Sequence, residues 1–91
     1  MHEEYVKESK IVEKKEEEKK QELIVSIIKT KRELEKCNKN FEFAKEELID
    51  YYLYAIKANQ AKLDYLIKKA KLNGISLERI KEIDIRKNKV V

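Results

Sequence analysis

The sequence predicts an all-α protein: an antiparallel two-helix hairpin followed by a short C-terminal helix. One Gly and no Pro among 91 residues leave little turn chemistry for a sheet. Charged residues make up 44% of the chain and hydrophobic residues 42%, and the hydrophobic ones recur at alternating steps of three and four between residues 23 and 72. The glycine, Gly74, follows the longest of these stretches, where helices commonly end.

Residues 1–22 form a charged N-terminal extension with six lysines and eight glutamates. Their few apolar residues make no continuous seam. Such a composition is typical of a loose, solvated segment, because side-chain ion pairs on a helix surface contribute only about 0.2–0.5 kcal/mol each. The alternative is a segment that becomes ordered against a partner.

The first amphipathic helix is predicted over Leu23–Phe41, the start of a hairpin domain that spans residues 23–73. Cys37 lies on its apolar seam and is predicted to be a small core residue rather than a nucleophile, since His2 is the chain's one histidine and lies far from it in the sequence. The seam follows a heptad pattern, as in coiled coils: Leu23, Ile27, Thr30, Leu34, Cys37, Phe41 and Ala44.

A break in the helix is expected between residues 41 and 48. Continuing the same spacing beyond residue 48 brings Lys62 and Lys69 into the seam, and the stronger apolar row is displaced by one position. Asn38 and Asn40, both poor helix formers, come just before the break. One uninterrupted helix is the alternative.

The second helix, Leu48–Leu72, is predicted to be about 40 Å long, and it carries two apolar rows. Two rows predict two neighbours, because a helix with one neighbour shows a single stripe. Along one row, Asn59 is either a buried polar residue that sets the register or a residue at the edge of the bundle. That row is Ile49, Tyr52, Ile56, Asn59, Leu63, Leu66 and Ala70, and the other is Tyr51, Tyr54, Ala58, Ala61, Tyr65 and Leu72.

The segments NFEF at 40–43 and ELIDYYLYAIKANQAKLDYLIKKAK at 47–71 resemble the YaaL-like family of short bacterial proteins. The most specific part is Leu-Ile-Asp-Tyr-Tyr at 48–52, and the resemblance covers roughly residues 22–73. It implies a helical hairpin in a domain of unknown function, with no assigned activity or cofactor. In that family a turn-forming segment, often with a proline, precedes Leu-Ile-Asp; here residues 44–47 occupy this place without a proline.

Residues 74–91 are predicted to form a short helix and a basic tail. Ser76 is a suitable N-cap, and Glu78 is favourable in the first turn. The helix is expected to span about two turns, with residues 86–91 as the tail. Its apolar residues are expected to fold back over the end of the hairpin: Ile75, Leu77, Ile80 and Ile83.

The sequence predicts no catalytic residue, no metal ligand and no cofactor site. It contains no glycine-rich phosphate loop and no Cys/His cluster. Asp50 and Asp64, the carboxylates of the second helix, are separated by about 21 Å along its axis, too far for paired acid–base work. Asp50 suits the helix N-terminus, and Asp64 is expected to pair with Lys68. We therefore expect a protein that is not an enzyme.

The second apolar row of the central helix is the predicted interface. A hairpin of two helices cannot cover both rows, and a contiguous exposed apolar patch is unusual on a soluble monomer. We expect a homodimer that forms a four-helix bundle, with an unidentified protein partner as the alternative. The interface residues are Tyr51, Tyr54, Ala58, Ala61, Tyr65 and Leu72.

Charge and hydropathy bound the remaining classes of function. The formal net charge is +4, an excess that is mild for nucleic-acid binding; a weak, sequence-independent nucleic-acid-binding accessory protein is therefore the second hypothesis. The mean hydropathy is −0.75, and no apolar run approaches the roughly 20 residues of a membrane span. With a single cysteine and a charged N-terminus, the chain is expected to be cytoplasmic and to have no membrane partner.

Overall fold

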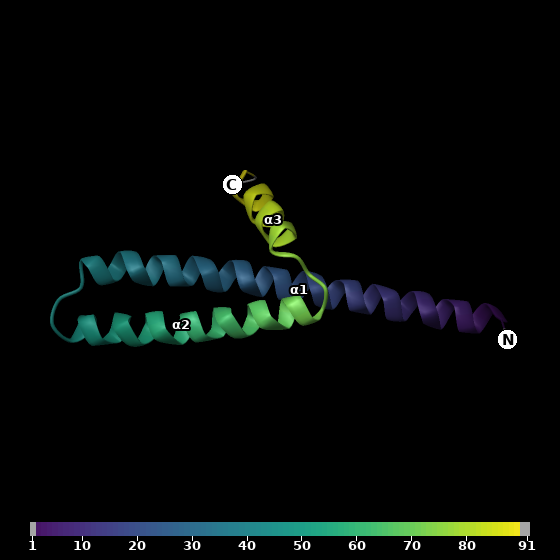
Figure 1. Ribbon diagram of the computed structural model, residues 1–91, viewed down its shortest axis with the longest axis horizontal. Helices are drawn as coiled ribbons and strands as arrows, with labels where there is room; N and C mark the ends of the chain where they lie inside the picture. The colour runs from purple at the N-terminus through teal and green to yellow at the C-terminus, as the bar shows by residue number, and fades with distance from the viewer. Residues whose placement is uncertain (1, 90–91) are drawn as a thin grey trace.

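The computed structural model describes residues 2–89, and the side chains of residues 15–87. Within residues 2–89 it contains three helices and no strand: α1 (His2–Glu42), α2 (Glu47–Leu72) and α3 (Leu77–Lys89). Figure 1 shows α1 and α2 side by side and antiparallel, with the N-terminal part of α1 projecting beyond the hairpin. The predicted all-α hairpin is confirmed, in a molecule 67 Å long and only 17 Å thick.

The first helix begins much earlier than the sequence predicted. α1 starts at His2 rather than Leu23, so the prediction of the start of this helix was wrong. Lysine and glutamate are good helix formers, and once the packed part of α1 is helical, each further residue extends it without a new nucleus. The side chains of residues 15–19 are exposed, as expected of a charged extension, whereas those of residues 1–14 lie outside the described ones.

One face of α1 packs against α2, and the predicted seam forms it. Thr30 is the buried polar member, and its hydroxyl donates a hydrogen bond to the Ser26 carbonyl oxygen at 2.7 Å. On the α2 side, Leu66 and Ala70 are buried. The buried seam residues of α1 are Leu23, Ile27, Thr30 and Cys37, with Leu34 and Phe41 half-buried.

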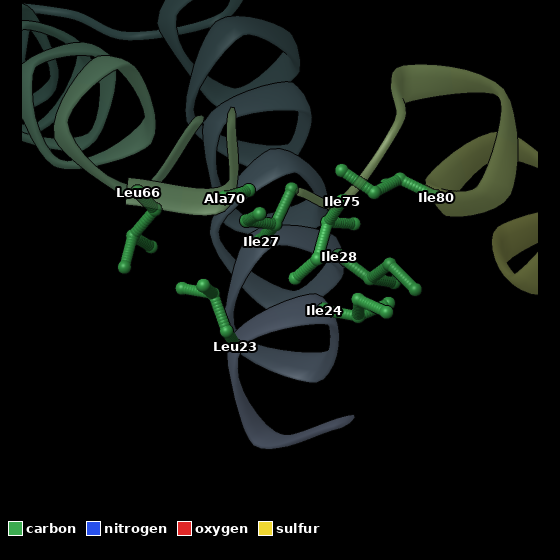
Figure 2. Close-up of a cluster of buried hydrophobic side chains, with 8 residues drawn as sticks. All are labelled: Leu23, Ile24, Ile27, Ile28, Leu66, Ala70, Ile75 and Ile80. Carbon is green, nitrogen blue, oxygen red and sulfur yellow. The ribbon is translucent and has the colours of Figure 1, made fainter. Parts of the chain in front are cut away.

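A second apolar row on α1 was missed by the sequence prediction. Ile24 and Ile28, each one position beyond the seam, are the largest fully buried side chains, with 0% and 2% of their surface exposed. They belong to the same cluster as Ile75 and Ile80. Figure 2 shows α1 between the two groups, with Leu66 and Ala70 on one side and the two C-terminal isoleucines on the other.

The turn between α1 and α2 confirms the predicted break. Residues 43–46 are outside the helices, and α1 closes with hydrogen bonds from the amides of Phe43 and Ala44 to the carbonyls of Asn40 and Phe41. Glu46 then adopts φ 56° and ψ −124°, close to the first central position of a type II′ turn, where glycine is preferred. The turn therefore places a glutamate in a strained backbone conformation.

The corner between α2 and α3 is a Schellman motif. Gly74 has φ 75°, its amide donates to the Lys71 carbonyl at 3.1 Å, and the Ile75 amide donates to the Ala70 carbonyl at 3.0 Å. The left-handed conformation at Gly74 costs little because glycine has no Cβ. Ile75 is 3% exposed, so the motif turns the chain and also delivers a core residue.

The third helix is longer than predicted. The amide of Arg79 donates to the Ser76 hydroxyl oxygen at 3.1 Å, which confirms Ser76 as the N-cap, but α3 continues to Lys89 and includes residues predicted as a basic tail. Ile80 is buried and Ile83 packs against the core cluster, whereas Leu77 is 46% exposed. The predicted folding back is therefore correct for Ile75, Ile80 and Ile83 but not for Leu77.

An ion-pair cluster joins α3 to α1. The Asp84 carboxylate accepts hydrogen bonds from the Lys31 ammonium at 3.2 Å and from the Arg32 guanidinium at 3.1 Å. The Asp84 side chain is only 14% exposed. A carboxylate this shielded, bound by two cations from one helix, fixes where α3 crosses α1.

We expect Glu46→Gly to stabilise the protein by about 1 kcal/mol, because glycine relieves a backbone strain of about 1–2 kcal/mol at a modest entropic cost. Urea unfolding followed by circular dichroism measures the change. Lys45→Gly in the same turn is the matched control. Lys45 does not have a positive φ, so this variant should be destabilised. Equal effects of both glycines would contradict the assignment of strain to Glu46.

We expect Asp84→Asn to weaken the docking of α3 by about 1 kcal/mol, since exposed ion pairs contribute about 0.2–1 kcal/mol each and a partly buried carboxylate somewhat more. Amide hydrogen exchange should accelerate in α3 while α2 is unchanged. Glu82→Gln, an exposed position on the same helix, removes the same charge and should have little effect. Faster exchange in both variants would indicate an effect of net charge instead.

Candidate functional site

The six predicted interface residues lie together on α2 and face away from α1. Successive members are three, four, three, four and seven residues apart along α2, which places them on one side of the helix. All six are exposed, and the large ones strongly so: Tyr51 62%, Tyr54 70%, Tyr65 62% and Leu72 88%, with Ala58 and Ala61 between them. We call these six residues the tyrosine face.

The other row of α2 explains this orientation. Tyr52, Ile56 and Leu63 are half-buried, and Leu66 and Ala70 are buried against α1. At about 100° per residue, the centre of this row and the centre of the tyrosine face are about 150° apart around the helix. One contact with α1 therefore cannot cover both rows.

An aromatic contact ties the tyrosine face to the hairpin core. The rings of Tyr51 and Tyr52 meet edge to face, with centroids 5.0 Å apart and planes at 78°, a favourable geometry for aromatic pairs. Tyr52 lies on the other row of α2 and is half-buried, so its ring limits the positions open to the Tyr51 side chain. A large side chain restrained in this way loses less conformational entropy when a partner covers it.

Charged side chains flank the tyrosine face. Glu47 and Asp50 lie in the first turn of α2, and Lys69 and Lys71 lie in its last turn. The helix dipole favours negative charge at the first of these ends and positive charge at the second. Between them, Asp64 accepts a hydrogen bond from the Gln60 amide at 3.0 Å. The expected ion pair of Asp64 with Lys68 does not form among the described side chains; the hydrogen bond from Gln60, four residues earlier, is present instead.

Cys37 and Asn59 meet between the two helices of the hairpin. Cys37 is 5% exposed, as predicted for a core residue. The Asn59 amide donates to the Ala55 carbonyl at 2.9 Å and lies 3.9 Å from the Cys37 sulfur. Its strong hydrogen bond is to its own helix, so Asn59 specifies the register of the hairpin only through the weak contact with sulfur. It is half-buried, which favours the interpretation as an edge residue.

Two open grooves lie elsewhere on the surface. One, of about 600 Å³, runs between α1 and the end of α2 and is lined mainly by lysines and glutamates, together with Leu23 and Leu66. The other, of about 560 Å³, lies between α1 and α3. Neither lining includes a histidine or a cysteine. Among the described residues, no group of three or more His, Cys, Asp and Glu side chains is placed to hold a metal ion.

The structure leaves further apolar residues exposed that were not assigned to the interface. Phe43 is 81% exposed, Leu48 53% and Leu53 39%, all at the end of the hairpin that α3 does not reach (Figure 1).

Within residues 2–89, none of the helices combines the length and the apolar character needed to cross a membrane.

The comparisons with known proteins identify a family but no activity. The family DUF2508, described as "Protein of unknown function", matches residues 2–77. This range includes all of α1 and α2, the corner that follows, and the first residue of α3. No curated protein and no solved structure matches the chain. Because the match covers more than half of the sequence, the chain belongs to the DUF2508 family of proteins of unknown function.

Proposed function

We propose that this protein is a small structural or protein-interaction module that acts through the tyrosine face of α2, and that its first partner is a second copy of itself. The observation that carries the proposal is the exposure of Tyr51, Tyr54 and Tyr65, each above 60%, in one row. Tyrosine is enriched at protein interfaces, whereas contiguous exposed apolar patches are uncommon on monomers.

The exposed area is sufficient for a modest interface. A tyrosine buries about 150–250 Å² when it is fully covered, so three tyrosines at these exposures offer roughly 300–490 Å² per chain. A stable interface buries about 800 Å² per partner. Leu72, the two alanines and the aliphatic parts of neighbouring lysines would supply the remainder, which supports a reversible dimer.

The arrangement of such a dimer follows from the two faces of α2. The contact with α1 and the tyrosine face are about 150° apart around the helix, whereas a closed square of four helices needs contacts about 90° apart. Because contacts 150° apart do not close such a square, the geometry favours an open row in which the two copies of α2 form the centre. The four-helix bundle stays a prediction.

The remaining expectations also belong to this proposal. We propose a protein without catalytic activity, on the ground that Cys37 is buried and His2 is far from it in the sequence. We further propose that this DUF2508 chain is a YaaL-like, bacterial, cytoplasmic protein. The support is the Leu-Ile-Asp-Tyr-Tyr segment at 48–52.

We expect Ala58→Glu to convert a dimer into a monomer. Ala58 is exposed at the centre of the tyrosine face, and glutamate there would place an unpaired charge in the middle of a desolvated contact. Sedimentation at tens of micromolar should give a dimer for the wild type and a monomer with unchanged helicity for the variant. Asn38→Glu, which adds the same charge at an exposed position on α1, should remain dimeric. A monomeric wild type would refute the proposal of self-association.

A second candidate function is weak binding of single-stranded nucleic acid. Base stacking needs exposed aromatic rings beside cations, and the exposed tyrosines of α2 have exposed lysines nearby, namely Lys57, Lys62, Lys69 and Lys71. Residues 48–91 carry ten basic and five acidic residues. Opposing this function, Glu47, Asp50 and Asp64 interrupt the positive surface.

We expect any such binding to be independent of base sequence and to fall steeply with salt, because it would depend on counterion release. Fluorescence anisotropy with two labelled oligonucleotides of different sequence, at increasing salt, measures this. Lys62→Gln should weaken binding more than Lys36→Gln, an exposed position on α1. Sub-micromolar binding of one sequence that survives raised salt would contradict the expectation and indicate specific recognition.

A further inference from the structure

We propose that two copies meet through α2 in an antiparallel orientation and in one defined register. This inference rests on the proposed self-association and adds the direction and alignment of the contact. The contact row runs along the tyrosine face and includes Lys68 between Tyr65 and Leu72. In this register, the residue numbers of two positions that face each other across the contact add up to 119, so the two-fold axis passes between Ala58 and Ala61.

The order of side-chain sizes along the tyrosine face supports this register. Ala58 of one copy faces Ala61 of the other, and small residues at a crossing allow helix axes to approach to about 8 Å. One layer farther out, Tyr54 faces Tyr65 of the second copy. In the next layer Tyr51 faces Lys68 of the second copy, where an ammonium group can lie against an aromatic ring.

A parallel pairing would lose this complementarity. It would place each residue of the row opposite the same residue of the second copy. Lys68 would then face Lys68 of the second copy inside the contact. Two like charges in a partly desolvated contact are strongly unfavourable. The antiparallel register instead moves each Lys68 opposite an aromatic side chain, so the seam selects against the parallel dimer.

The charged residues beside the row favour the same direction. Asp50, Lys57, Asp64 and Lys71 recur every seven residues along one flank of the tyrosine face, and all four are exposed. In an antiparallel helix pair this flank meets its own copy. Asp50 then lies beside Lys71 of the second copy and Lys57 beside Asp64 of the second copy. Two-fold symmetry doubles these to four pairs of opposite sign, the kind of flanking charge that sets helix orientation.

In a parallel pair this flank would meet the opposite one, which contains Leu48, Ala55, Lys62 and Lys69. Lys57 would then approach Lys62 of the second copy. Helix dipoles add to the difference, because an antiparallel pair places the acidic first turn of α2 beside the basic last turn of its copy. Size, side-chain charge and dipole therefore agree on one orientation.

The hairpin leaves room for this contact. α1 packs on the other row of α2, and α3 packs on α1 rather than on α2 (Figure 1). A second copy approaching the tyrosine face meets neither α1 nor α3 of the first.

Disulfide trapping tests the orientation. Two variants are made in a Cys37→Ala background, one with Tyr51→Cys and one with Lys68→Cys. In the proposed register these positions face each other, whereas two copies of position 51 are about 25 Å apart along the axis, well beyond the 4.4–6.8 Å Cα separation of a disulfide. Mild oxidation of the mixture should give mainly the mixed dimer. Predominant dimers of the Tyr51→Cys variant with itself would overturn the antiparallel orientation.

Charge exchange tests the register. Lys57→Glu and Asp64→Lys should each weaken the dimer about tenfold, because symmetry changes two ion pairs in every dimer. The double variant should recover to within about threefold of the wild type. Lys36→Glu, the same charge change on an exposed part of α1, is the control and should not alter the dimer.

The outcomes separate this inference from the proposal on which it depends. A wild type that is monomeric in sedimentation refutes self-association and the register together. A dimeric wild type whose double variant is no tighter than the single variants refutes the register alone. A dimer with both the mixed disulfide and the rescue supports orientation and alignment.

Discussion

The fold depends on two adjacent apolar rows, which lie within about one and a half turns of α1 and pack against different neighbours. Leu23 and Ile27 face α2, while Ile24 and Ile28 join the cluster with Ile75 and Ile80. Fully burying a side chain of this size contributes about 1.5–3 kcal/mol, so this short segment supplies a large share of the core. The Schellman corner completes it, because the hydrogen bond from the Ile75 amide to the Ala70 carbonyl directs the chain from one face of α1 to the other.

This constraint makes the hairpin uneven along its length. Near the corner three helices meet, and Leu66 and Ala70 are buried. Toward the turn at residues 43–46 only two helices are present, and Ile49, although on the inner row, is 39% exposed. A two-helix layer cannot remove both sides of a helix from water, so apolar surface accumulates at this end. The position of α3 therefore decides where the molecule has surface to offer a partner.

Much of this arrangement was predictable, and the failures have definite causes. The seam of α1, the break near residue 43 and the exposed row of α2 follow from helical periodicity alone. The second row on α1 was missed because Ile24 and Ile28 are adjacent to seam residues and look like a widened single stripe. The predicted start of α1 was wrong because a charged segment has no apolar periodicity to mark where a helix begins. Exposure of the tyrosine face was predictable. Its aromatic contact with Tyr52 and the docking of Asp84 were not, because they depend on side-chain conformations and on where α3 crosses α1.

The uneven hairpin and the proposed antiparallel contact are related. In the antiparallel register, Leu48 lies at the end of one hairpin that α3 does not reach. It would face Lys69 of the second copy, close to the corner that leads to α3 of that copy. Leu48, part of the apolar surface left exposed near the turn, would then be covered by the aliphatic stem of that lysine. In a parallel dimer the two thin ends would lie together, and neither would gain a supported neighbour. An uneven two-helix layer is thus stabilised most evenly by a partner that runs in the opposite direction.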